Sequence, residues 1–166
     1  MDEKKQRAFD ERYLRMARIW SENSYAIRRQ VGCLIVKERM IISDGYNGTP
    51  SGFENICEYP TCMRDGGCNR VDGEGVDCLH CPDAKLTTQP YVLHAEANAI
   101  SKLAKSHNSA EGATLYTTDE PCLQCSKLII QSGIRRVVFQ REYHDHDGVE
   151  LLKRAGIEVE QIIPNI

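Results

Sequence analysis

Two stretches decide how this sequence folds and what chemistry it carries: His94-Ala95-Glu96 and Pro121-Cys122-Leu123-Gln124-Cys125. Apolar residues follow both stretches at helical spacing, so each stretch is predicted to open a helix. Because Cys122 and Cys125 are three residues apart, one helix face presents both sulfurs. With the imidazole of His94 they make three zinc ligands and leave one tetrahedral position open, as in a catalytic rather than a structural zinc site.

Glu96 is the predicted catalytic group of this arrangement. It lies two residues after His94, so its carboxylate is expected to reach the open position of the zinc without binding the metal. A carboxylate placed there can accept a proton and later return it. The alternative is a core histidine beside a small structural cysteine clamp. Either stretch alone leaves that alternative open, whereas the two together favour a catalytic zinc.

Working outward from these stretches, the hydrophobic periodicity predicts alternating helices and strands. Alternation in the second half implies parallel neighbouring strands and helices packed on a sheet. We therefore expect a three-layer α/β/α fold with a mixed central sheet of about five strands. The expected helices cover residues 2–24, 94–106, 121–132 and 149–155, and the expected strands cover 31–36, 40–43, 113–117, 136–140 and 157–162.

Length and charge limit the range of functions. At 166 residues the chain is expected to form a single domain over 1–166. Its net charge of −3 argues against a nucleic-acid partner, which usually leaves a basic footprint. No apolar run has the length of a membrane span, and the charged N-terminus does not resemble a secretory signal. Eight cysteines in such a chain indicate metal binding or catalysis in the cytoplasm rather than disulfides.

Further stretches narrow the class of protein. The most discriminating is Gly45-Tyr46-Asn47-Gly48-Thr49-Pro50-Ser51-Gly52, which is too rich in glycine and proline for a regular element and is expected to form a shaped loop. Together with the two opening stretches, it makes the chain resemble the deoxycytidylate (dCMP) deaminase family of the cytidine deaminase-like superfamily. Matching residues also occur at 31–32, 97–100, 111–116, 133–134 and 155–159.

The resemblance implies zinc-dependent hydrolysis of dCMP to dUMP and ammonia. It also implies a homo-oligomer, in many relatives a hexamer, that dCTP activates and dTTP inhibits, with Mg²⁺ accompanying the nucleotide. By the same resemblance, Asn47 binds the deoxyribose and Tyr143 lies near the sugar-phosphate end. The alternatives are a turn residue for Asn47 and a loop-packing aromatic ring for Tyr143.

The substrate phosphate requires positive charge. The candidates are Arg28, in the pair Arg28-Arg29, and Lys102 and Lys105 on the helix that follows His94. Each of these residues has the alternative of being solvated surface.

A cysteine-rich insertion at about 53–90 separates the glycine-rich loop from His94. Such a long loop with little apolar content is expected to be pinned, and a second, structural zinc would pin it. The expected ligands are Cys62, Cys68, Cys78 and Cys81, with Cys57 as the substitute. The alternative is unligated thiols. Cys33, within a strand, is expected to be a small core residue.

Two other functions compete with dCMP deamination. One is another zinc nucleobase deaminase, acting on tRNA adenosine or on free cytosine or guanine. A tRNA enzyme would need basic patches for its polyanionic substrate, which a mildly acidic chain does not suggest. The other is a catalytically silent, zinc-stabilised nucleotide-binding module, which should lack Glu96 or one of the metal ligands. All of these residues are present.

Overall fold

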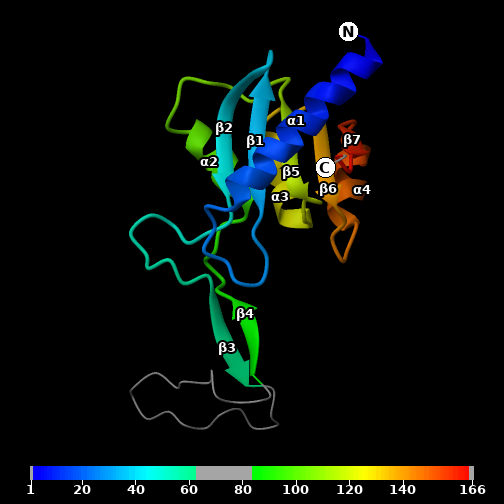
Figure 1. The fold of residues 1–166 in the computed structure, drawn as a ribbon. Coiled ribbons are helices and arrows are strands. Elements are labelled where there is room, and N and C mark those ends of the chain that lie inside the picture. The colour runs from blue at the N-terminus through cyan, green and yellow to red at the C-terminus, as the bar shows by residue number, and fades with distance from the viewer. Residues whose placement is uncertain (1, 63–83, 165–166) are drawn as a thin grey trace.

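The computed structural model describes residues 2–62 and 84–164 (Figure 1). Its four helices are α1 (Glu3–Ser21), α2 (Ala95–Leu103), α3 (Leu123–Gln131) and α4 (Asp147–Arg154). Its strands, in chain order, are β1 (Gly32–Lys37), β2 (Met40–Tyr46), β3 (Glu58–Cys62), β4 (Ala84–Thr88), β5 (Thr114–Asp119), β6 (Arg136–Arg141) and β7 (Glu158–Gln161).

Five strands form one mixed sheet in the order β2-β1-β5-β6-β7. The β2/β1 and β1/β5 pairs are antiparallel. The β5/β6 and β6/β7 pairs are parallel, with Leu115 beside Val137 and Val137 beside Val159. The prediction of a mixed five-stranded sheet with a parallel second half is therefore confirmed.

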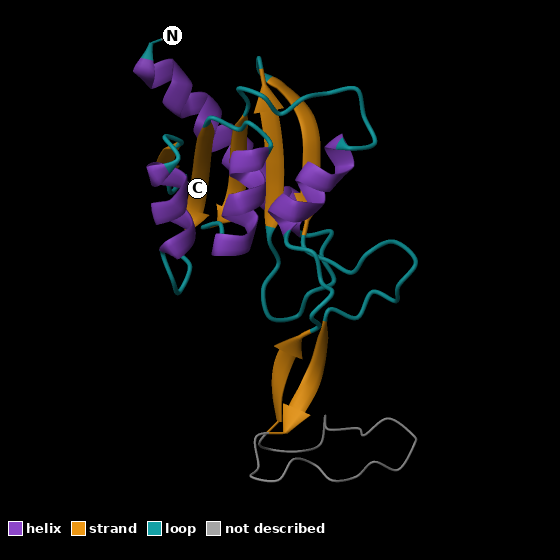
Figure 2. Ribbon diagram, turned by 180° about the vertical axis from the view of Figure 1, so that it is seen from behind, coloured by secondary structure: helices purple, strands orange, loops and turns teal. Residues whose placement is uncertain are grey.

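Helices cover both faces of this sheet. Helix α1 crosses one face, while α2, α3 and α4 lie side by side on the other, which Figure 2 shows from behind. Each interface has its own apolar core. The core under α1 contains Leu14, Ala17, Leu34, Val36, Tyr116, Val138 and Ile162. The core under the other helices includes Cys33, Ile35, Ala99, Leu115, Ile129, Val137 and Leu152. The three-layer α/β/α prediction is confirmed, and Cys33 is fully buried as expected.

A buried ionic network fixes α1 to the sheet. Asp10, on α1, is 1% exposed and accepts hydrogen bonds from Tyr116 of β5 (2.6 Å) and from both terminal nitrogens of Arg136 of β6 (2.9 and 3.0 Å). Burial alone would raise the pKa of Asp10, but the bonds from Arg136, Tyr116 and Gln6 lower it below 3.8. The network therefore holds Asp10 as a carboxylate.

Three local expectations need correction. The glycine-rich stretch is not all loop, because β2 continues to Tyr46. Gly45 lies where α2 comes closest to the sheet, and a Cβ there would be 2.1 Å from the carbonyl oxygen of Ala95. Proline at 121 does not open a helix, because α3 begins at Leu123 with Cys122 as its N-cap.

The third correction concerns the insertion, which contains a β-hairpin that the sequence pattern did not reveal. Strands β3 and β4 pair antiparallel, with Glu58 opposite Thr88. Figures 1 and 2 show this hairpin projecting beyond the sheet. Because its ends, Cys57 and Gln89, are joined by a backbone hydrogen bond of 2.8 Å, the hairpin returns the chain to the site region. In the described part of the chain, no helix is long and apolar enough to cross a membrane.

Candidate active site

Three side chains converge at the start of α2 and α3. His94 is the N-cap of α2, Cys122 is the N-cap of α3, and Cys125 lies in the first turn of α3. The Nδ1 atom of His94 is 3.5 Å from each of the two Sγ atoms. A tetrahedral zinc about 2.1 Å from nitrogen and about 2.3 Å from sulfur would separate these atoms by about 3.6 Å. The residues therefore fit zinc in both donor type and spacing.

The three side chains of the cluster share protons. Hydrogen bonding from Cys125 and His94 outweighs burial and lowers the pKa of Cys122 to about 3. The contact with Cys122 and burial raise the pKa of Cys125, and the bond to Cys122 raises the pKa of His94. Cys122 is therefore the thiolate of the group, whereas Cys125 and His94 would each release a proton when a metal binds.

Glu96 faces the same cavity from the first turn of α2. Its side chain is 3% exposed, and burial raises the pKa of its carboxyl to about 7. A group with such a pKa exchanges protons readily near neutral pH. Two close contacts set the position of α2: Gly45 on β2, and the two backbone hydrogen bonds (2.9 and 3.1 Å) that join Gly48 to Leu93.

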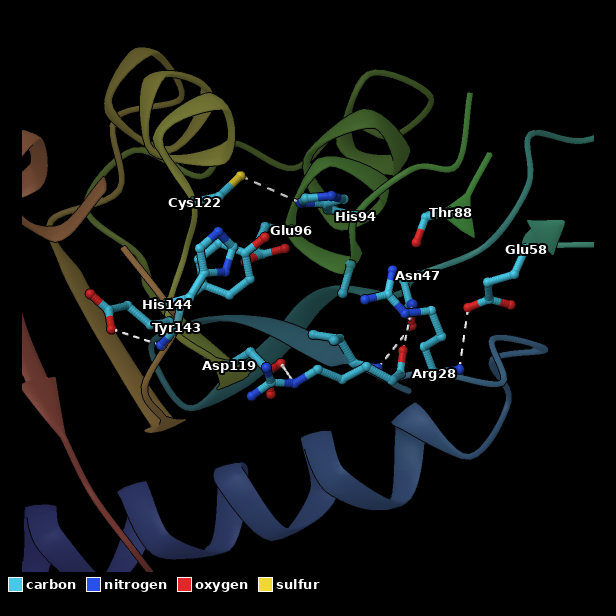
Figure 3. Close-up of a pocket in the computed structure, with 14 residues that line it drawn as sticks. Arg28, Asn47, Glu58, Thr88, His94, Glu96, Asp119, Cys122, Tyr143 and His144 are labelled. Carbon is cyan, nitrogen blue, oxygen red and sulfur yellow. Dashed lines mark hydrogen bonds and ion pairs between the residues drawn. The ribbon is translucent and has the colours of Figure 1, made fainter. Parts of the chain in front are cut away.

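A pocket of about 410 Å³ opens in front of these groups (Figure 3). It brings together six residues that the sequence analysis singled out from five separate parts of the chain. They are Arg28, Asn47, His94, Glu96, Cys122 and Tyr143. Arg29, Val31, Glu58, Thr88, Ala95, Asp119, Glu120 and His144 complete the lining.

The side chain of Asn47 shapes one wall of the pocket. Its Oδ1 accepts a hydrogen bond from the amide of Val31 (2.8 Å), and its Nδ2 donates to the carbonyl oxygen of Arg29 (2.9 Å). The residue thus fixes the loop that carries Arg28. The sequence analysis did not predict this role.

Glu58 was missed by the sequence analysis. It is 7% exposed, and its two carboxylate oxygens accept the amide hydrogens of Ile27 (3.1 Å) and Arg28 (3.3 Å). Figure 3 shows Glu58 on the insertion side of the pocket with Arg28 beside it. Its position at the start of an unrecognised strand gave no usable signal.

Asp119 and Glu120 were also missed, although their position carries a signal. Asp119 ends β5 and Glu120 follows it, directly before the metal stretch. Strand β5 is parallel to β6, and the carboxyl ends of parallel strands commonly line sites. Asp119 pairs with Arg29 (2.5 Å) and Arg141 (2.6 Å). Glu120 accepts the amide hydrogen of Tyr143 (3.0 Å) and lies 2.9 Å from Nδ1 of His146, so it positions the loop that carries Tyr143.

The two lysines lie elsewhere. Within the described residues, neither Lys102 nor Lys105 lines the pocket that contains Glu96. Lys102 forms an ion pair with Asp44 (2.7 Å) and lines a separate cavity beside the glycine-rich loop. The structure therefore gives no support to these two residues as phosphate ligands.

Most insertion cysteines cannot be placed. Cys68, Cys78 and Cys81 lie outside the described residues, and of Cys62 only the backbone, at the end of β3, is described. Cys57 is a buried free thiol, 2% exposed. In residues 2–62 and 84–164, the only group of three or more side chains arranged to hold a metal is His94, Cys122 and Cys125.

The fold and the site together define a class of protein: a three-layer α/β/α domain in which a His/Cys/Cys group and a nearby glutamate form the site is typical of zinc-dependent nucleobase deaminases. Residues 7–141 match the family described as the cytidine and deoxycytidylate deaminase zinc-binding region. The chain belongs to this family, on its dCMP deaminase branch.

Individual relatives agree with this placement. The deoxycytidylate deaminase of Saccharomyces cerevisiae is 36% identical over 93% of this chain, which spans 45% of the yeast protein. That of Enterobacteria phage T4 is 33% identical, with 88% of this chain and 86% of the phage protein covered. A crystal structure of dCMP deaminase from the cyanophage S-TIM5, in complex with dCMP and dUMP, superposes with a TM-score of 0.76. The two chains are 37% identical, and the match covers 98% of this chain and 99% of the cyanophage chain.

Proposed function

We propose that the protein hydrolyses dCMP to dUMP and ammonia at a zinc held by His94, Cys122 and Cys125. The observation that carries the proposal is the buried carboxylate of Glu96, in the same pocket as this His/Cys/Cys group and as Arg28. The identity shared with the cyanophage enzyme, whose crystal structure contains dCMP and dUMP, supports the choice of substrate.

The chain's own residues account for the proton transfers. When bound, zinc supplies an acidified water, with a pKa lowered to about 7. Glu96 accepts a proton from the attacking water and delivers it to N3 of the cytosine ring as the oxygen adds to C4. Glu96 then takes the proton of the new C4 hydroxyl and passes it to the amino nitrogen as the C4–N4 bond breaks, so that C4 becomes a carbonyl and ammonia leaves. One carboxylate thus acts first as base and then as acid.

The remaining pocket residues would bind the nucleotide. Arg28 is exposed at the pocket rim, and its guanidinium is suited to the 5′-phosphate. Asn47 would bind the deoxyribose while holding the Arg28 loop, and Tyr143 would contact the sugar-phosphate end. The positions of these side chains around one cavity support the assignments (Figure 3).

The resemblance to the dCMP deaminases supports further features of the proposal. The chain would form a single domain with its insertion and assemble as a hexamer. A second zinc would be bound by Cys62, Cys68, Cys78 and Cys81, with Cys57 as the substitute ligand. The enzyme would be activated by dCTP and inhibited by dTTP, with Mg²⁺ accompanying the effector. A cytoplasmic location would keep the thiolate ligands reduced.

The test is ammonia release from dCMP, deoxycytidine, cytosine, guanine and a tRNA, with and without dCTP. We expect release from dCMP, and removal of the 5′-phosphate should lower kcat/KM strongly. No release from dCMP under either condition would refute the substrate assignment, and faster release from a free base or tRNA would favour another deaminase. No release from any substrate by zinc-loaded protein would favour a silent binding module.

A further inference from the structure

The backbone of the loop that carries Arg28 is held by side chains rather than by secondary structure. The loop lies between α1 and β1, and in the described part of the chain no backbone–backbone hydrogen bond involves residues 26–30. Its backbone instead bonds to the hydroxyl of Ser24, the side-chain amide of Asn47 and the carboxylate of Glu58. The position of Arg28 therefore depends on these side chains.

Glu58 holds the part of the loop from which the Arg28 side chain leaves. One carboxylate oxygen accepts the amide hydrogen of Ile27 (3.1 Å) and the other accepts that of Arg28 (3.3 Å), on the side of the pocket shown in Figure 3. The residue is 7% exposed, and among residues 2–62 and 84–164 no ion pair includes it. A buried carboxylate is costly unless hydrogen bonds satisfy it, so the carboxylate and the two amides fix one another.

The insertion hairpin determines where this carboxylate lies. Glu58 begins β3 directly opposite Thr88, the last residue of β4, and both residues line the catalytic pocket. The backbone hydrogen bond between Cys57 and Gln89 closes the hairpin next to this pair. The insertion therefore does more than hold its own shape, because its base forms one wall of the pocket.

We propose that Glu58 is a positioning residue through which the insertion hairpin holds Arg28 toward the 5′-phosphate of the substrate. This inference rests on the proposed function, in which Arg28 binds that phosphate. With both amides bonded before the substrate arrives, the loop does not have to be ordered at the expense of binding. Loss of one acceptor should weaken binding of a substrate that carries a phosphate and leave the chemistry at the zinc unchanged.

The kinetic test compares Glu58→Gln with Glu54→Gln, which removes the same charge from an exposed position of the insertion. The glutamine retains one acceptor oxygen and places an NH₂ group against the second amide. In zinc-loaded Glu58→Gln alone, we expect KM for dCMP to rise about tenfold, while kcat and KM for deoxycytidine stay within about threefold. Glu58→Asp, which keeps both acceptors, should retain more of the parental affinity. A purely structural anchor would change the thermal midpoint but not the ratio of the two KM values.

Hydrogen exchange tests the loop without a substrate. Mass spectrometry at residue resolution follows the amides of Ile27 and Arg28, with the amide of Val31 as the internal reference because it bonds to Asn47. In Glu58→Gln we expect the first two amides to exchange about tenfold faster, since they lose part of their protection, and the reference amide to be unchanged.

Several results would overturn the proposal: unchanged exchange at Ile27 and Arg28, an unchanged or lowered KM for dCMP, equal KM increases for dCMP and deoxycytidine, or equal effects in Glu54→Gln. A lowered KM would indicate that Glu58 acts by repelling the phosphate. No ammonia release from dCMP by the parent protein would instead refute the proposed function. The exchange rates would then still decide whether Glu58 holds the loop.

Discussion

At the scale of single residues, the site combines chemical groups with groups that only hold them in place. In the proposed mechanism Glu96 and the three metal ligands carry the chemistry, and all four were predicted from the sequence. Asn47, Glu58 and Glu120 act through hydrogen bonds to backbone amides and carbonyls of the surrounding loops. Substitutions should separate the two kinds of residue, because chemical groups affect turnover and positioning groups affect binding of the substrate.

Glu96→Gln should lower kcat by about 10²–10⁴, because the amide cannot shuttle protons. Zinc content, measured by metal analysis of the purified variant, should stay unchanged, since Glu96 is not one of the three ligands. Glu150→Gln, an exposed change on α4, is the control. A Glu96→Gln enzyme with parental turnover would refute the proton-transfer role.

Asn47→Ala should raise KM for dCMP more than it lowers kcat. The substitution removes the bonds to Val31 and Arg29 and so loosens the loop that carries Arg28. Each of the two lost hydrogen bonds is worth about 1 kcal/mol, so a KM increase of about tenfold to thirtyfold is expected. Steady-state kinetics on dCMP and deoxycytidine test this, because loss of the loop should matter less without a phosphate. An equal KM increase for both would assign Asn47 to the sugar alone.

At the scale of elements, two close contacts hold the helices that carry the zinc ligands. Gly45 lets α2 approach β2, and Gly148, at the start of α4, lies against the backbone before α3. A Cβ on Gly148 would be 2.2 Å from the carbonyl oxygen of Pro121 and 2.8 Å from the carbonyl carbon of Cys122. On the other face of the sheet, Asp10 fixes α1.

Gly148→Ala should therefore displace the Pro121–Cys122 backbone and weaken zinc binding. We expect a destabilisation of about 1–3 kcal/mol, the usual cost of overpacking. Competition with a colorimetric chelator measures zinc affinity, and Gly156→Ala is a useful comparison because a Cβ at that position meets nothing within 4 Å. Gly156 has a positive φ, so Gly156→Ala adds backbone strain and lowers stability. Its zinc affinity should nevertheless equal that of the parent protein, whereas the zinc affinity of Gly148→Ala should fall.

Asp10→Asn should lower the free energy of unfolding by about 1–3 kcal/mol, because it removes the charge-assisted hydrogen bonds of Arg136 to Asp10 while Glu158 and Glu160 still pair with the guanidinium. The pKa of Asp10 is lowered below 3.8 in the folded protein, so its ionised form stabilises the fold above that pH. The contribution is lost as the pH falls below 3.8 toward the folded value. Urea unfolding between pH 3 and pH 6 should show that acid-dependent loss in the parent protein and less of it in the variant. Equal pH slopes would contradict this assignment.

At the scale of the whole molecule, a zinc held by His94, Cys122 and Cys125 would join α2 to α3 and so link two helices of one layer. Removal of the metal by a chelator should lower the thermal midpoint, because ligand binding stabilises only the folded state. Metal analysis should find two zincs per chain in the parent protein and one in Cys78→Ser if the insertion holds the second ion. One zinc in the parent protein would contradict the second site.

The sequence predicts those features of the fold and the site that depend on residues close together in the chain. The helix around Glu96 and the strand pairs are encoded by hydrophobic periodicity, so their positions and the mixed sheet were predictable. The β3/β4 hairpin was not, because Pro60, Cys62 and their neighbours show no clear alternation of apolar and polar residues. Lys102 shows another limit of local information: its charge suggested a phosphate ligand, and its ion pair with Asp44 could not be predicted from the sequence.

By itself, the sequence determined the metal ligands, the glutamate and the order of the layers, because each depends on residue type and spacing along a single element. Only the tertiary structure decided which other residues face the zinc site. Glu58, Asp119 and Tyr143 meet in one pocket through long-range packing, and no local pattern encodes such a meeting. The same packing gathers five arginines into a groove within a chain of negative net charge.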